Sequence, residues 1–157
     1  MKLLIIRHGQ ASPLSEKGDT HRHLTDTGRR ELLRQLRILK KLGLQIDKLV
    51  TSPLLRARQT TKALRKKFLV RGKIEVWEEL SPDTEVKTLI DKLKNEPTDG
   101  LIALVGHNPI LSHVACRLLY FKPDSLVLNP AGIALLEIPS IQSETPAELL
   151  LWLNPAS

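Results

Sequence analysis

The sequence predicts an α/β fold: a single-domain, three-layer α/β/α sandwich with a mostly parallel central sheet and an antiparallel pair of strands at its C-terminal end. The chain has 157 residues, of which 41% are hydrophobic and 26% charged, as is typical of one globular domain. Short apolar runs alternate with helical patterns through most of the chain, which favours parallel strands joined by helices. The last two apolar runs are joined by a short, proline-bearing segment without helical periodicity. We therefore expect these two strands to be antiparallel and residues 1–157 to form one domain.

The predicted strands are short apolar runs. They are expected at residues 2–6, 46–51, 73–77, 101–105, 133–138 and 149–153. The run 101–105 is continuously apolar, which is typical of a strand that is buried on both faces.

Four helices are predicted between these strands. Thr25 is suited to cap the first helix, and Ser52 followed by Pro53 predicts the start of the second. The third and fourth helices follow from apolar residues at helical spacing. The helices are expected over residues 25–42, 52–68, 84–95 and 109–120.

The composition limits the classes of function and partner. Lysine and arginine number 24 against 17 acidic residues, a net charge of +7, which favours anionic partners such as nucleic acid or a phosphorylated substrate. Aromatic residues make up only 3%, which argues against stacking of single-stranded bases. The apolar runs are too short for a membrane helix or a signal peptide, and the single cysteine, Cys116, excludes an internal disulfide and a multi-cysteine zinc site. We expect a cytoplasmic protein without a membrane partner.

Histidine and arginine follow the ends of three predicted strands. The carboxyl ends of parallel strands share one rim of a sheet, where ligands bind. We therefore expect these residues to converge. The three segments are Arg7-His8-Gly9, the run from Ser52 to Thr60 that contains Arg56, and Gly106-His107-Asn108-Pro109.

Such a cluster is suited to a phosphoryl group. A guanidinium can pair with two phosphate oxygens, and a helix N-terminus offers further N–H donors. Positive charges beside a histidine favour its neutral form, whose free lone pair can attack phosphorus. The residues alone thus indicate phosphoryl chemistry.

The three segments, in this order and spacing, resemble the histidine phosphatase superfamily, which also contains phosphoglycerate mutases and acid phosphatases. The resemblance covers nearly the whole chain. The small size, the stretch from Arg22 to Thr25 and the absence of a long insertion after the third strand resemble the compact branch of SixA-type phosphohistidine phosphatases.

The resemblance implies a phosphoglycerate mutase-like fold and a role for each motif residue. His8 would be the nucleophile that becomes phosphorylated, and Arg7 and Arg56 would bind the phosphoryl oxygens. His107 would donate to these oxygens in the transition state, and Gly9 would allow close approach of the backbone. Water would then hydrolyse the intermediate, with no metal and no cofactor.

Three further assignments are predicted for residues near these segments. Glu79 is the first candidate for the acid that protonates the leaving group, ahead of Glu78 and Asp19. The alternatives are that the glutamates form a solvated acidic turn, or that a phosphoramidate, which leaves as imidazole, needs no such acid. Arg22 and Asn108 are expected to bind the phosphate or its carrier.

The leading functional prediction is a phosphatase that acts on phosphohistidine carried by a protein. The first alternative is a phosphatase of small phosphomonoester metabolites with the same mechanism. The second is a basic module that binds nucleic acid and leaves the histidines idle. We expect a phosphorylated substrate and no nucleic-acid partner; the sequence specifies neither the oligomeric state nor the pathway.

Overall fold

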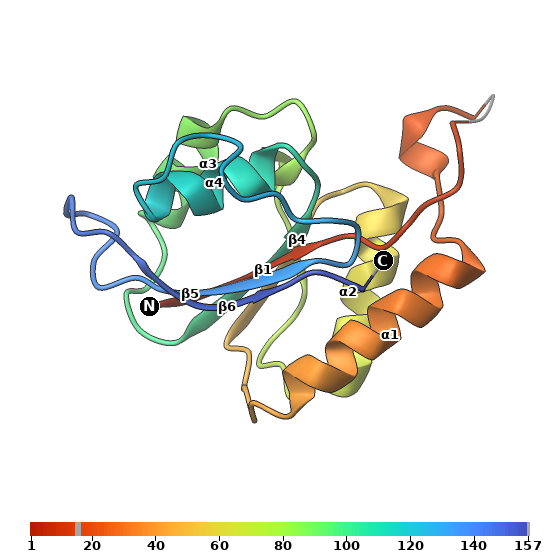
Figure 1. The fold of residues 1–157 in the computed structure, drawn as a ribbon, viewed down its shortest axis with the longest axis horizontal. Helices are drawn as coiled ribbons and strands as arrows, with labels where there is room; N and C mark the ends of the chain where they lie inside the picture. Colours follow the sequence, from red (N-terminus) through yellow and green to blue (C-terminus); the bar gives the residue numbers. More distant parts are fainter. Residues whose placement is uncertain (15–16, 157) are drawn as a thin grey trace.

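The fold is a sheet with helices on both faces, and the predicted site residues lie at one edge of it, where the parallel strands end. Within residues 1–14 and 17–156, which the computed structural model describes, six strands form one sheet in the order β3-β2-β4-β1-β5-β6 (Figure 1). The strands are β1 (Lys2–Arg7), β2 (Lys48–Thr51), β3 (Glu75–Val76), β4 (Leu101–Gly106), β5 (Ile133–Glu137) and β6 (Glu148–Leu153).

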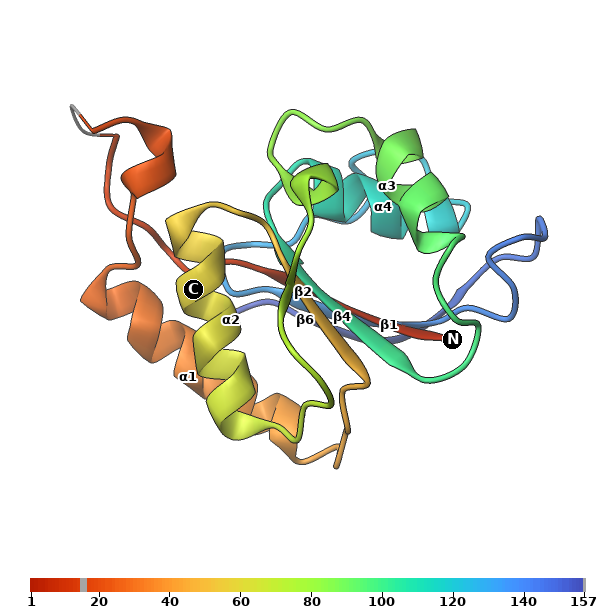
Figure 2. The same ribbon diagram turned by 180° about the vertical axis from the view of Figure 1, so that it is seen from behind.

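The helices lie in two layers. The helices are α1 (Asp26–Lys40), α2 (Leu55–Lys67), α3 (Val86–Leu93) and α4 (Ile110–Leu118), with short 3-10 helices η1 (Asp19–His21) and η2 (Glu78–Leu80). Figures 1 and 2 show α1 and α2 on one face of the sheet and α3 and α4 on the other. In the described part of the chain, none of these helices has the length and apolar character needed to cross a membrane.

The strand directions confirm the predicted sheet. Strands β1, β2, β3 and β4 pair in parallel, whereas β5 is antiparallel to both β1 and β6. In this register Arg7 lies opposite Gly106, and Thr51 lies opposite Val105. The residues that follow β1, β2 and β4 therefore emerge side by side.

Strand β1 shows how the sheet separates two apolar cores. Leu3 and Ile5 pack into the core that includes α3 and α4, whereas Leu4 and Ile6 pack into the core that includes α1 and α2. All four side chains are fully buried, and each contributes about 1.5–3 kcal/mol to folding through burial. Successive strand side chains point to opposite faces, so a continuous apolar run fits a central strand.

Several predicted boundaries shift in the structure. The cap of α1 is confirmed, because the Thr25 hydroxyl accepts a hydrogen bond from the Gly28 N–H at 2.9 Å. The start of α2 at Ser52 is wrong: the helix begins at Leu55, with Leu54 at the N-cap position. The predicted strand 73–77 shrinks to two residues, because β2, the strand beside it, pairs with it only through Val50 and Thr51.

Candidate active site

His8 directly follows the last residue of β1, and one nitrogen of its imidazole ring carries no proton. Its side chain is buried, and Nδ1 lies 2.7 Å from the Gly9 carbonyl oxygen. A carbonyl can only accept, so Nδ1 carries the ring proton and donates it. The other nitrogen, Nε2, accepts a hydrogen bond from Arg56 Nε–H at 3.3 Å. A lone pair at Nε2 is the feature that a nucleophilic histidine requires.

The surroundings of His8 keep the ring neutral at pH 7. Burial is the largest cause and lowers the pKa of His8 to about 4. The bond to the Gly9 carbonyl raises the pKa, whereas the charges of Arg56, Arg7 and Arg22 lower it further. The sequence predicted the direction of this shift from the arginines, but burial contributes more than they do.

His107 lies next to His8 at the end of β4. The two ring centroids are 4.9 Å apart, with 58° between the ring planes. Burial, followed by the proximity of His8 and Arg56, lowers the pKa of His107 to about 3. Within residues 1–14 and 17–156, its Nδ1 atom is buried without a hydrogen-bond partner.

Ser52 contacts His107 instead of capping α2 in the way the sequence predicted. Its Oγ lies 2.7 Å from His107 Nε2, although the two residues are 55 positions apart. Ser52 Oγ also accepts a hydrogen bond from the Leu54 N–H at 3.3 Å. The serine thus fixes the orientation of the imidazole, a role that its residue type in the sequence did not indicate.

Two arginines extend into the site beside the histidines. Arg56 is 4% exposed and directs Nη1 to the Asp19 carbonyl at 2.9 Å and Nη2 to Asp19 Oδ2 at 3.1 Å. Arg7 Nη1 donates to the Leu128 carbonyl at 2.8 Å, whereas its Nε is buried and unpartnered among the described residues. Buried polar groups are usually paired, so the unpartnered Arg7 Nε–H and His107 Nδ1 mark a place where a ligand is expected.

Asp19 also joins Arg22 to the cluster. Arg22 Nη1 donates to Asp19 Oδ1 at 3.2 Å, and Arg22 Nε donates to the Ser12 carbonyl at 2.7 Å. Burial alone would raise the pKa of Asp19, but the hydrogen bonds and charges of Arg22 and Arg56 outweigh it and lower this pKa. Asp19 is therefore ionised at neutral pH, which disfavours it as a proton donor. No motif in the sequence indicates the contact of Asp19 with Arg56.

Gly9 contacts both α1 and α2. Its N–H donates to Thr60 Oγ1 at 3.3 Å, and the Thr60 hydroxyl donates to the Arg56 carbonyl at 2.9 Å. A Cβ atom at Gly9 would lie 3.1 Å from the Gly28 carbonyl oxygen and 3.2 Å from Leu24 Cδ2. The glycine thus permits tight packing against α1, while its predicted contact with substrate stays a prediction.

The roles of Glu79 and Asn108 also stay predictions. Glu79 Oε1 forms an ion pair with Lys92 Nζ at 3.4 Å. Asn108 Nδ2 donates to the Leu128 carbonyl at 2.7 Å, and its Oδ1 accepts from the Ser112 hydroxyl at 2.7 Å. Asn108 and Arg7 therefore hold the same carbonyl group, which ties the segment before β5 to the rim of the sheet.

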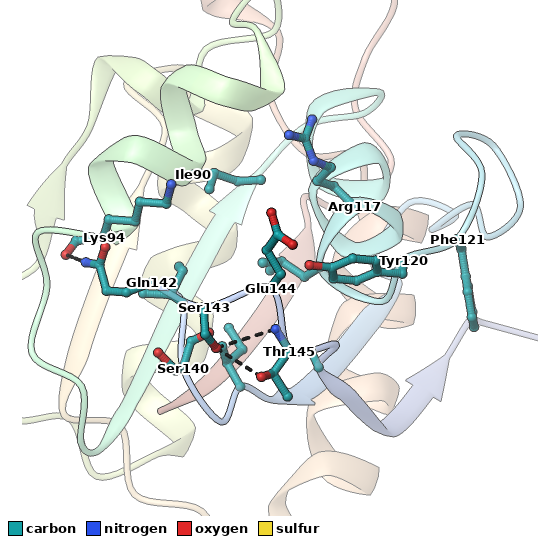
Figure 3. A pocket seen from close by; sticks show the side chains of 14 residues that line it. Ile90, Lys94, Arg117, Tyr120, Phe121, Ser140, Gln142, Ser143, Glu144 and Thr145 are labelled. Carbon is teal, nitrogen blue, oxygen red and sulfur yellow. Dashed lines mark hydrogen bonds between the residues drawn. The ribbon is translucent and has the colours of Figure 1, made fainter.

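A separate cavity of about 620 Å³ lies between α3, α4 and the β5–β6 connection (Figure 3). Lys94, Arg117 and Tyr120 contribute to its wall, and none of the predicted site residues does. Ile138, which lines it, donates its N–H to the carbonyl of Met1. The cavity therefore lies near the amino end of β1, away from His8 at the carboxyl end. In the described part of the chain, no group of three or more His, Cys, Asp or Glu side chains is placed to hold a metal ion.

Comparisons with known proteins agree with this architecture. A phosphohistidine phosphatase SixA homolog from Haemophilus influenzae is 29% identical over 143 residues, covering 85% of this chain and 86% of that protein. The structure of the protein histidine phosphatase SixA complexed with tungstate matches with a TM-score of 0.87 at 23% identity, over 99% of this chain and 97% of that chain. The structure of a putative alpha-ribazole-5'-P phosphatase from Escherichia coli matches with a TM-score of 0.76 at 18% identity, over 97% and 96% of the two chains.

The family assignment follows from the sequence match together with the fold. Residues 3–81, which include Arg7, His8 and Arg56, match the family described as histidine phosphatase superfamily (branch 1). The SixA homolog and the SixA structure extend the similarity over most of the chain. The chain therefore belongs to the histidine phosphatase superfamily and is a phosphatase of the SixA type.

Proposed function

We propose that this phosphatase removes the phosphoryl group from phosphohistidine on a protein, through a covalent intermediate on His8. One observation carries the proposal: the neutral His8 ring presents Nε2 beside a buried arginine and beside unpartnered donors. Such a site combines a nucleophile with groups that stabilise negative charge on transferring oxygens.

In the first step, His8 Nε2 attacks phosphorus. The N–P bond forms as the bond to the leaving group breaks, and the His8 ring becomes cationic because both of its nitrogens are then substituted. The Gly9 carbonyl, which accepts the Nδ1–H at 2.7 Å, stabilises that positive charge. This interaction offsets part of the cost of charging a buried ring.

Donors on three side chains bind the phosphoryl oxygens in this proposal. Arg7 Nε–H and the Arg56 guanidinium supply positive charge, and His107 supplies a ring N–H at Nδ1. That proton sits at Nδ1 when the Ser52 hydroxyl donates to Nε2. Ser52 is therefore the residue that selects the donating form of His107.

In the second step, water attacks the phosphoryl group of phosphohistidine. The new P–O bond forms as the N–P bond breaks, and neutral His8 leaves with its proton still on Nδ1. The proton lost by the water passes to phosphate or solvent. A low pKa at His8 assists this step, because a weakly basic imidazole is a good leaving group.

The ionised state of Asp19 favours phosphohistidine over alkyl phosphates. An alkoxide leaving group needs a protonated acid, whereas imidazole needs much less assistance. Asp19, which contacts Arg56 in the site, is held ionised by Arg22 and Arg56. The name of the SixA homolog points the same way. A small phosphomonoester is the second candidate, supported by the similar fold of the putative alpha-ribazole-5'-P phosphatase.

A comparison of leaving groups tests the substrate. The kcat/KM values of the wild type, Glu79→Gln and Glu78→Gln are measured on a histidine-phosphorylated protein, p-nitrophenyl phosphate and an alkyl phosphate. We expect rapid turnover of the phosphorylated protein by all three enzymes and poor turnover of the alkyl phosphate. Glu78, the second candidate acid, is exposed and is tested beside Glu79. Efficient wild-type hydrolysis of the alkyl phosphate, lowered ~10²–10⁴-fold only in Glu79→Gln, would establish the small-molecule function instead.

A further inference from the structure

A groove of about 580 Å³ runs between α1 and α2 on one face of the molecule. Figures 1 and 2 both show these two helices side by side. Leu24 and Leu32 are buried in its floor, and Leu33 and Ala63 are half-buried along it. The groove thus offers an apolar floor that is open to solvent.

Four cations line this groove, and no anionic side chain of the described residues pairs with them. Arg29, Lys62, Lys66 and Lys67 contribute to the lining, which includes no acidic residue. Within residues 1–14 and 17–156, none of the four side chains forms an ion pair or a hydrogen bond. Some lysines elsewhere in the described chain are paired, as Lys48 is with Glu96 at 2.6 Å, but the groove is distinguished by four cations that surround one apolar floor. Four like charges beside one groove repel each other, and an anionic partner would relieve this repulsion.

One end of the groove lies close to the segment that follows His8. The Leu24 N–H donates to Gln59 Oε1 at 2.8 Å, which links the start of α1 to α2, and both residues line the groove. Leu24 also packs against Gly9, the residue after His8, and Thr60, the neighbour of Gln59, accepts the Gly9 N–H. A segment lying in the groove would therefore end close to the nucleophile.

We propose that this groove docks an acidic segment of the protein substrate, with apolar side chains on the floor and Asp or Glu side chains against the four cations. The proposal rests on the proposed function, because it assumes a protein that carries phosphohistidine. Charge complementarity and continuity with His8 favour this occupant. A nucleic acid would match the charge but not the apolar floor, and the lining contains no aromatic residue on which bases could stack.

The test compares two triple variants that lose the same charge. Lys62→Gln, Lys66→Gln and Lys67→Gln are combined in the groove variant. Lys40→Gln, Lys41→Gln and Lys122→Gln, all at exposed positions outside the groove lining, are combined in the control variant. The substrates are an acidic protein domain phosphorylated on one histidine, the free amino acid phosphohistidine, and p-nitrophenyl phosphate.

We expect the groove variant to lose ~10-fold or more in kcat/KM on the phosphorylated domain, mainly through KM, and to lose most of its salt dependence. Its rates on free phosphohistidine and p-nitrophenyl phosphate should equal those of the wild type. The control variant should stay within about twofold on all three substrates, as expected for solvent-exposed charges away from the interface.

A second variant tests the apolar floor without changing charge. Ala63→Gln adds a side chain that fills part of the groove, and it should raise KM for the phosphorylated domain alone. Thermal unfolding confirms that each variant is folded.

The outcomes separate the docking proposal from the proposed function. Equal effects of the two triple variants would assign the salt dependence to overall charge and overturn the docking proposal. Loss of RNA binding in the groove variant, with unchanged kinetics on the phosphorylated domain, would also overturn it. If the wild type hydrolyses neither the phosphorylated domain nor free phosphohistidine, the proposed function itself is overturned.

Discussion

At the scale of single residues, Asp19 and Arg56 define the state of the site before phosphate binds. Arg56 is nearly buried, and its two terminal nitrogens point to the backbone and carboxylate oxygens of Asp19. These are the same donors that the proposed mechanism gives to phosphoryl oxygens. Asp19 therefore holds the guanidinium in the orientation that an oxyanion needs, and a phosphoryl group must compete with its carboxylate.

The first prediction concerns Arg56. Replacing it with lysine keeps the charge but removes the planar fork and the Nε–H bond to His8. We expect kcat/KM to fall by at least ~10²-fold, on the scale of losing one preorganised oxyanion donor. Steady-state kinetics on p-nitrophenyl phosphate measure this effect. Arg58→Lys, at an exposed position of the same helix, is the control; equal rates for both variants would show that the fork is not needed.

Contacts between distant residues limited what the sequence could predict at this scale. His8, Arg7, Arg56 and His107 could be brought together from the strand ends alone, because parallel strands share a rim. Asp19 lies in a polar loop and contacts Arg56, which is 37 positions away in the sequence. A loop has no periodic pattern from which such a contact could be predicted. Ser52 has the residue type of a helix cap, and only the position of His107 shows that its hydroxyl is used elsewhere.

At the scale of elements, the site depends on how α1 docks against the segment after β1. Gly9 and Gly28 face each other there: a Cβ atom at Gly9 would be tight against its neighbours, and Gly28 has no room for one. A Cβ atom at Gly28 would overlap the backbone of Gln10. The start of α1 thus fixes the position of the residues next to His8.

The second prediction follows from this packing. Gly28→Ala should destabilise the protein by about 1–3 kcal/mol, because backbone must move to admit the methyl group. It should also lower turnover, since Gln10 lies two residues from His8. Denaturant unfolding and kinetics check both effects. Thr27→Ala, at an exposed position of the same turn, should change neither property much; a Gly28→Ala protein as stable and active as Thr27→Ala would contradict this account.

The elements themselves were largely predictable. Apolar runs indicated all six strands of the described sheet, because burial on one or both faces leaves a clear pattern. Their ends were not predictable from that pattern. Residue 46 forms only an isolated bridge, and the Asp47 carboxylate accepts the Leu101 N–H at 2.8 Å in place of a strand carbonyl. The hydrophobic pattern predicts which residues are buried. The residue at which a strand ends depends instead on individual hydrogen bonds such as that of Asp47.

At the scale of the whole molecule, folding keeps two histidines uncharged and so links stability to pH. The pKa values of His8 and His107 fall to about 4 and about 3, chiefly through burial. The unfolded chain takes up protons on these residues below about pH 6.5, whereas the folded protein does not. Stability is therefore fully present above about pH 6.5 and is lost as the pH falls.

The third prediction is the size of this pH effect. Each of the two histidines should lower the free energy of unfolding by up to about 1.4 kcal/mol per pH unit between pH 6.5 and pH 5. Denaturant unfolding at several pH values measures the slope. His8→Gln and His107→Gln should each make the slope smaller, whatever they do to stability at pH 7. A wild-type slope of zero over this range would contradict the lowered pKa values.

The central claim is that His8 carries the phosphoryl group, and trapping the intermediate tests it most directly. Wild type and His8→Ala are mixed with p-nitrophenyl phosphate carrying a radiolabelled phosphoryl group and quenched without acid, which preserves an N–P bond. Peptide mapping then locates the label. We predict acid-labile label on the peptide containing His8 in the wild type, and neither label nor turnover in a folded His8→Ala protein. Label on the His8→Ala protein, or wild-type label on His107, would contradict the assignment of the nucleophile.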